Sequence, residues 1–146
     1  MKADLSWLAN YYLPIGKRSV FKFSNRGGSV FNKNLLRNEL IRIGGNKILR
    51  GFDEESIYVS TYVLSTLEYR FILQRNSYFA VFYDFAYTRA KFNNELTQNF
   101  PIGFGLGINI ETKIGIFGLS YALGHQKTNP INFRNSKIHF GYVVQF

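Results

Sequence analysis

The stretch SYFAVFYDFAYTR, residues 77–89, decides the fold. Large apolar side chains fill one alternate row and a mixture of aromatic, small and polar residues fills the other: Phe79, Val81, Tyr83, Phe85 and Tyr87 against Tyr78, Ala80, Phe82, Asp84, Ala86 and Thr88. A period of two residues is typical of a β-strand whose two faces meet different surroundings. The stretch therefore predicts a strand with one strongly apolar face and one mixed face.

Six further stretches alternate in the same way, some of them less regularly. They cover residues 3–13, 19–28, 59–73, 101–111, 115–124 and 136–146, whereas 31–45 stays ambiguous. The face opposite the apolar row is rich in Gly, Ala, Ser, Thr and Asn and has few charges. A soluble barrel or sandwich would turn a charged face to water, so this composition favours lipid on one face and a polar cavity on the other. We expect an all-β, antiparallel transmembrane β-barrel portion of about seven strands.

The predicted connections alternate between short and long. Short turns fall at 14–18, 74–76 and 111–115, and long segments fall at 31–57, 89–99 and 125–136. In bacterial outer-membrane barrels, short turns face the periplasm and long loops face the exterior. The pattern therefore places the C-terminus on the periplasmic side.

Composition argues against several classes of function. The net charge is +9, but the basic residues are scattered rather than gathered in a stripe, so no nucleic-acid partner is expected. Without cysteine, the chain has no disulfides and no thiolate metal site. His125, interpreted as a loop residue, lies far in sequence from His139, and neither has a carboxylate at ligand spacing. No catalytic set can be assembled, so the chain is expected to be no enzyme and to carry no cofactor or metal.

Two motifs carry a family resemblance. The segment RIGG at 42–45, followed by Leu49-Arg50-Gly51-Phe52 in the longest connection, resembles the RGF loop of the outer-membrane assembly-factor superfamily. That superfamily includes BamA, TamA, two-partner secretion translocators and bacterial surface antigen barrels. The C-terminal pattern is similar to the β-signal of such barrels, with a polar residue, glycine, an apolar residue and a final aromatic: His139, Gly141, Val144 and Phe146. With the strands predicted after the loop, the resemblance covers essentially the whole chain.

The resemblance implies a fold and a set of contacts. In the family, the strands after the RGF loop are the last strands of a sixteen-stranded barrel, and the loop folds back into the lumen. Arg50 would then contact Glu68 and Asp84, which strand alternation independently places on the inner face. Gly51 would permit the sharp turn, and Phe52 would pack inside the lumen.

One feature departs from the family pattern. Phe85-Ala86 stands where a small, glycine-containing pair is expected after the aspartate. This departure bears on how closely the loop approaches the barrel wall. The alternative for Arg50 is an ordinary exposed loop arginine.

The strand count suggests an incomplete barrel. The smallest single-chain bacterial barrels need eight strands, and open strand edges are costly in lipid. No secretory signal follows Met1. We therefore expect residues 1–146 to be a single, incomplete domain, the C-terminal part of an outer-membrane β-barrel, with no periplasmic domains or signal peptide in this chain.

The expected function is that of the parent barrel, which is to insert or translocate polypeptides at the bacterial cell outer membrane. Gly141 would weaken strand 136–146, and a seam beside this strand would open and pair with an incoming strand. The implied partners are outer-membrane lipid and lipopolysaccharide, the rest of the barrel with its periplasmic domains, and client outer-membrane polypeptides. The alternatives are a barrel that anchors or exports a fused passenger of the patatin-like type, a passive outer-membrane antigen or pore, and a soluble β-barrel carrier.

Overall fold

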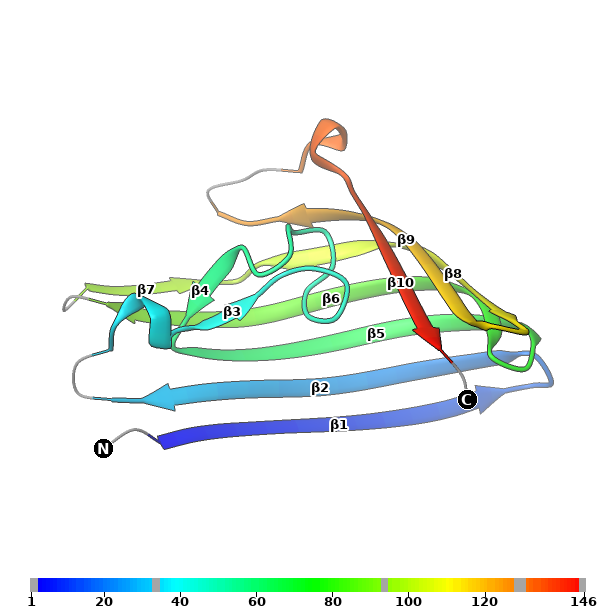
Figure 1. The fold of residues 1–146 in the computed structure, drawn as a ribbon, viewed down its shortest axis with the longest axis horizontal. Coiled ribbons are helices and arrows are strands. Elements are labelled where there is room, and N and C mark those ends of the chain that lie inside the picture. Colours follow the sequence, from blue (N-terminus) through cyan, green and yellow to red (C-terminus); the bar gives the residue numbers. More distant parts are fainter. Residues whose placement is uncertain (1–2, 33–34, 93–94, 128–130, 145–146) are drawn as a thin grey trace.

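The computed structural model describes residues 3–32, 35–92, 95–127 and 131–144. One antiparallel sheet dominates this part of the chain (Figure 1). Its strands, in spatial order, are β1 (Ala3–Ile15), β2 (Ser19–Phe31), β5 (Thr61–Gln74), β6 (Ser77–Phe92), β8 (Ile102–Thr112), β9 (Gly115–His125) and β10 (Lys137–Val144), and β7 (Glu95–Asn99) pairs with the end of β6. The prediction of an all-β antiparallel sheet is thus confirmed.

The connection between β2 and β5 has a structure of its own. It contains the single-turn helix η1 (Arg37–Glu39) and two short strands, β3 (Ile41–Ile43) and β4 (Ile57–Val59), which pair with each other. Residues 31–45, ambiguous in the sequence, therefore contain both a helical turn and a strand. A second turn, η2 (Phe133–Asn135), precedes β10. Neither helix of the described residues is long or apolar enough to cross a membrane.

Three details of the sequence prediction were wrong. The predicted strand 59–73 begins at Thr61, because Val59 ends β4 and Ser60 forms a bend between the two strands. The predicted long loop 89–99 is largely a hairpin, in which β6 runs to Phe92 and β7 pairs back against it. No proline or glycine interrupts this segment, so strand pairing can satisfy its backbone groups. His125, interpreted as a loop residue, ends β9 and pairs with Ile102 of β8.

Strand β6 shows how the two faces of the sheet differ. Its outward side chains are large and exposed, and Val81 keeps 53% of its surface accessible. From Ala80 to Thr88 its inward side chains are buried, with Phe82 at 2% and Asp84 at 1%. The sheet therefore turns apolar surface outward and encloses polar groups on its inner side. An exposed apolar face beside a polar interior is the arrangement found in membrane-spanning barrels.

The sheet is curled but not closed. In the described residues, β1 pairs with β2 alone and β10 pairs with β9 alone, so these two strands are its edges. The segment between β3 and β4 lies on the inner side of the curl, and β10 runs obliquely beside it (Figure 1). This arrangement brings the central loop and the last strand together.

Candidate functional site: the loop between β3 and β4

The loop from Gly44 to Ser56 is held in a fixed shape by its own backbone. Gly44 N donates to the carbonyl of Ile48 at 3.0 Å, and Gly45 N donates to the carbonyl of Leu49 at 3.2 Å. Leu49 has φ of 64°, a left-handed conformation that costs an L-residue about 1–2 kcal/mol. Its side chain is almost completely buried, and that packing offsets the backbone strain. The turn aims the next residue, Arg50, at the wall of the sheet.

Arg50 is bound by two carboxylates from neighbouring strands. Its Nε and Nη2 donate to Oδ2 and Oδ1 of Asp84 on β6 at 2.9 and 2.8 Å. Its Nη1 donates to Oε2 of Glu68 on β5 at 2.8 Å. The guanidinium also lies 3.5 Å from the ring centroid of Phe82, close enough for a cation–π contact. A planar fork of donors suits two carboxylates at once, which a lysine could not reproduce.

Asp84 is saturated with donors. Besides the two side-chain bonds from Arg50, it accepts the backbone N–H of Arg50 at 3.0 Å and the hydroxyl of Thr66 at 2.8 Å. Burial disfavours the charge on Arg50, but the bonds and charges of Asp84 and Glu68 outweigh it. The pKa of Arg50 is therefore raised above its ordinary value, and the guanidinium stays charged. Because desolvation offsets much of the attraction, the cluster fixes position more than it adds stability.

Glycines on the wall make room for the loop tip. A Cβ added to Gly103 on β8 would collide with the backbone oxygen of Arg50, and one added to Gly124 on β9 would collide with the backbone oxygen of Gly51. Gly51 itself has φ of 96°, and a Cβ there would lie 2.6 Å from the backbone of Leu123. Glycine is thus required on both sides of this close backbone contact.

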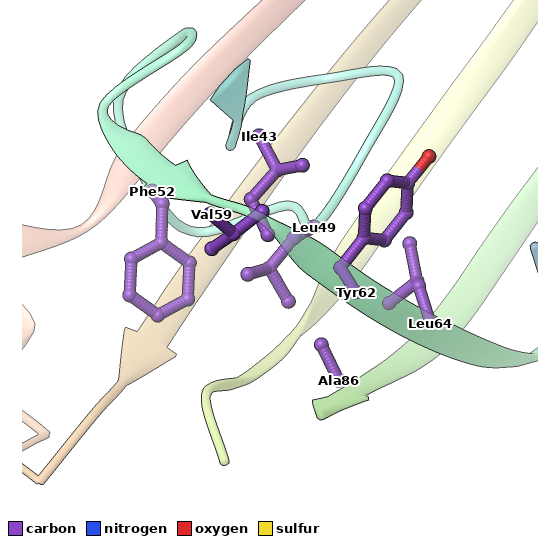
Figure 2. Packing of buried hydrophobic residues seen from close by; sticks show 7 residues of the cluster. All are labelled: Ile43, Leu49, Phe52, Val59, Tyr62, Leu64 and Ala86. Carbon is purple, nitrogen blue, oxygen red and sulfur yellow. The ribbon is translucent and has the colours of Figure 1, made fainter. Parts of the chain in front are cut away.

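Phe52 belongs to an apolar cluster on the inner side of the sheet (Figure 2). Leu49 lies among the other members, which come from the loop hairpin and from β5 and β6: Ile43, Val59, Tyr62, Leu64 and Ala86. Ala86 is completely buried in this cluster. The departure from the family pattern at Phe85-Ala86 is therefore accommodated, because the alanine is small enough for the loop and the phenylalanine points outward.

The sequence model described as the Omp85 superfamily domain matches residues 3–146. The chain belongs to the Omp85 superfamily. No protein of curated function matches the chain. Omp85 proteins reside in outer membranes, form the barrels of protein assembly and translocation, and are generally not enzymes.

Three residues named from the Omp85-like motif meet as the resemblance implied. Arg50, Glu68 and Asp84 form one cluster, although 18 and 34 positions separate the carboxylates from the arginine. Gly51 and Phe52 adjoin it. Arg50 is therefore not the ordinary exposed loop arginine that was the alternative, since its side chain is largely buried.

The residues of the C-terminal motif in this Omp85 chain do not gather at one site. His139 joins the loop site, where Nε2 accepts the backbone N–H of Gly51 at 3.2 Å. Gly141 faces the loop as well, whereas Val144 is exposed at the end of the described part of β10 and pairs with Gly115. Phe146 lies outside the described residues. The motif thus contributes one residue directly to the contacts of Gly51.

Several contacts of this Omp85 site were missed by sequence reasoning. Thr66 supports Asp84, Arg70 donates to Glu68 at 2.6 Å, and Arg26 of β2 donates to the loop carbonyl of Lys47 at 3.0 Å. Strand alternation places all three on the inner face, but alternation does not say which inner residues touch the loop. Within the described part of the chain, no three acidic, histidine or cysteine side chains gather as a metal site would require.

Proposed function

We propose that this chain forms the last strands of an outer-membrane barrel that inserts or translocates polypeptides in bacteria, as BamA-like and TamA-like proteins do. The observation that carries the proposal is the Omp85 match over residues 3–146. Family membership also counts against the soluble carrier, because Omp85 proteins reside in outer membranes. No feature of the structure favours the passenger-anchoring or antigen alternatives over assembly.

The proposal assigns the loop a positioning role and the edge of β10 a pairing role. Arg50, Gly51 and Phe52 hold the loop on the inner face through Glu68, Asp84 and the apolar cluster. In the described residues, one edge of β10 has no partner strand. An exposed strand edge accepts a further strand through backbone hydrogen bonds, and an incoming outer-membrane polypeptide would supply one.

The same edge supports the proposal that residues 1–146 act within a larger barrel. Backbone groups without partners at β1 and β10 would cost several kcal/mol each in hydrocarbon. Further strands would therefore be needed to close the barrel, and the resemblance to BamA-like proteins adds periplasmic domains to the proposal. The size of the native protein in outer-membrane fractions, measured by immunoblot, tests this directly, and a band near 16.9 kDa would contradict it.

The functional test is substitution of Arg50 in the complete protein. Removing one partner of a buried ion pair costs about 3–5 kcal/mol, so Arg50→Ala is expected to raise the population of released loop by roughly a hundredfold to several thousandfold. Protease cleavage within residues 44–56 should increase, and folded outer-membrane client proteins should decline on heat-modifiability gels. Arg50→Lys keeps the charge but not the fork, and we expect an intermediate effect.

Arg42→Ala is the matched control. Arg42 lies in the same connection, but it is exposed and its pair with Glu55 is 3.5 Å long. Such surface pairs contribute about 0–1 kcal/mol, so both readouts should stay near those of the unsubstituted protein. If depletion of the whole protein leaves client levels unchanged, the assembly function is wrong. If Arg50→Ala changes neither readout, the positioning role is wrong.

A further inference from the structure

All three inward residues in the first part of β10 face the loop. Lys137 Nζ lies 2.7 Å from Oδ1 of Asp53, and His139 Nε2 accepts the N–H of Gly51 at 3.2 Å. A Cβ on Gly141 would lie 3.0 Å from Nδ2 of Asn46, so the absence of a side chain lets the loop come close. Every second residue of β10 from Lys137 to Gly141 therefore rests on the loop.

Two successive backbone amides of the loop tip bond to two different strands of the sheet. Arg50 N donates to Asp84 on β6, and Gly51 N donates to His139 on β10. Strands β8 and β9 separate β6 from β10 in the sheet, which is about 14 Å along the sheet at normal strand spacing. The loop tip thus bridges two strands that do not pair with each other.

The contact at His139 fixes the chemistry of its ring. Because a backbone N–H can only donate, Nε2 must be the bare nitrogen and the proton of the neutral ring sits on Nδ1. Nδ1 faces Oε1 of Glu54 at 3.8 Å, and the same carboxylate oxygen accepts the N–H of Asn46 at 2.8 Å. His139 is thereby held between Gly51 and Glu54 of the loop, and its side chain is almost fully buried.

We propose that His139 is the latch between the loop and the edge strand, so that displacement of β10 and release of the loop are one coupled event. Strand β10 cannot move away from the loop without losing the hydrogen bond to Gly51 and the ion pair to Asp53. The ion pair is partly exposed and contributes little, so the buried bond at His139 carries most of the coupling. Such coupling is reciprocal: loosening the loop must also loosen β10.

The use of this latch rests on the proposed function. A strand that pairs with the free edge of β10 would pull that edge, and the latch would transmit the pull to Gly51 and so to the Arg50 cluster. Release of the loop would then accompany opening of the edge. The coupling itself is a property of the contacts and holds whether or not the protein assembles clients.

The first test measures hydrogen exchange by mass spectrometry in the complete protein in lipid nanodiscs. His139→Ala removes the acceptor for Gly51, and exchange should accelerate about fivefold or more in both residues 46–54 and residues 137–144. His139→Gln offers an acceptor oxygen and should restore part of the protection. Ser120→Ala is the control, because Ser120 pairs with His139 across β9 and β10, is buried, and makes no hydrogen bond through its hydroxyl.

The second test runs in the reverse direction and does not depend on a stable His139 variant. Arg50 contacts β5, β6 and β8 but not β10, so Arg50→Ala should speed exchange in residues 137–144 only through the contacts between the loop and β10, of which the bond at His139 is the buried one. Arg42→Ala should leave that segment unchanged. If Arg50→Ala frees the loop while β10 keeps its protection, the coupling is wrong. If exchange is coupled but depletion of the whole protein leaves client levels unchanged, the latch stands and the assembly function is wrong.

Discussion

Asp84 shows at the scale of one residue how a buried charge can be satisfied completely. Its two oxygens accept four hydrogen bonds, three from Arg50 and one from Thr66. A carboxylate accepts at all of these positions, whereas an amide would turn two of its own hydrogens toward donors. Asp84 therefore has no isosteric replacement in this site.

This leads to a prediction for Asp84→Asn in the complete protein. The substitution keeps the shape of the side chain but leaves the buried guanidinium with one carboxylate instead of two. We expect the free energy of unfolding to fall by about 3–5 kcal/mol. The measurement is urea unfolding followed by the folded band on unheated gels, and the urea concentration at the midpoint should fall. Glu55→Gln removes a carboxylate whose pair is exposed, so it should change the free energy by about 1 kcal/mol at most. Equal effects of the two substitutions would contradict the role given to burial.

At the scale of one element, β8 shows how a strand supports the loop by contact with its glycines. Its inward row contains Gly103, Gly105 and Gly107, but the loop presses on only one end of that row. The nearest neighbour of a Cβ at Gly107 would be 3.6 Å away, an ordinary contact. The glycines of this strand are therefore not equivalent.

The pair Gly103→Ala and Gly107→Ala separates these positions. At Gly103 the added methyl group meets the backbone oxygen of Arg50, which cannot move aside without shifting the loop tip. Overpacking of this kind costs about 1–3 kcal/mol, so the urea midpoint should fall and protease cleavage in residues 44–56 should rise. At Gly107 both readouts should remain close to those of the original protein. A larger effect at Gly107 would mean that strand propensity, and not loop contact, sets the need for glycine.

The elements also show what the sequence could and could not predict. Alternation of two residues predicted the seven long strands, because each face of a strand has one environment along its whole length. It missed β7, because this segment is polar and has no alternating row of apolar side chains. The family resemblance and strand alternation predicted the Arg50 cluster, but neither predicted the hydrogen bond from Gly51 to His139. A contact between residues 88 positions apart depends on how far the sheet curls, and no local pattern encodes that.

At the scale of the whole molecule, the distinction between the two faces determines what the protein can be. Apolar side chains cover the outer face of the sheet, while Arg50, Arg70, Glu68 and Asp84 gather on the inner face. Burying these charges against lipid would be far more costly than facing them toward water. The proposed orientation in the membrane follows from that difference.

Site-directed labelling tests this orientation, and the absence of cysteine from the chain makes it direct. Single-cysteine variants at Val81 and Leu106 place a spin label on the outer face, and variants at Lys22 and Asn109 place one on the inner face. In bilayers, outward labels should collide mainly with dissolved oxygen, and inward labels mainly with a water-soluble nickel chelate, because each relaxing agent concentrates in its own phase. Leu106 and Asn109 lie only three residues apart on one strand, about 10 Å along it, which keeps their difference in depth small beside the thickness of the bilayer. If oxygen relaxes Asn109 more strongly than Leu106, the sheet is oriented the other way, and the loop cannot lie in an aqueous lumen.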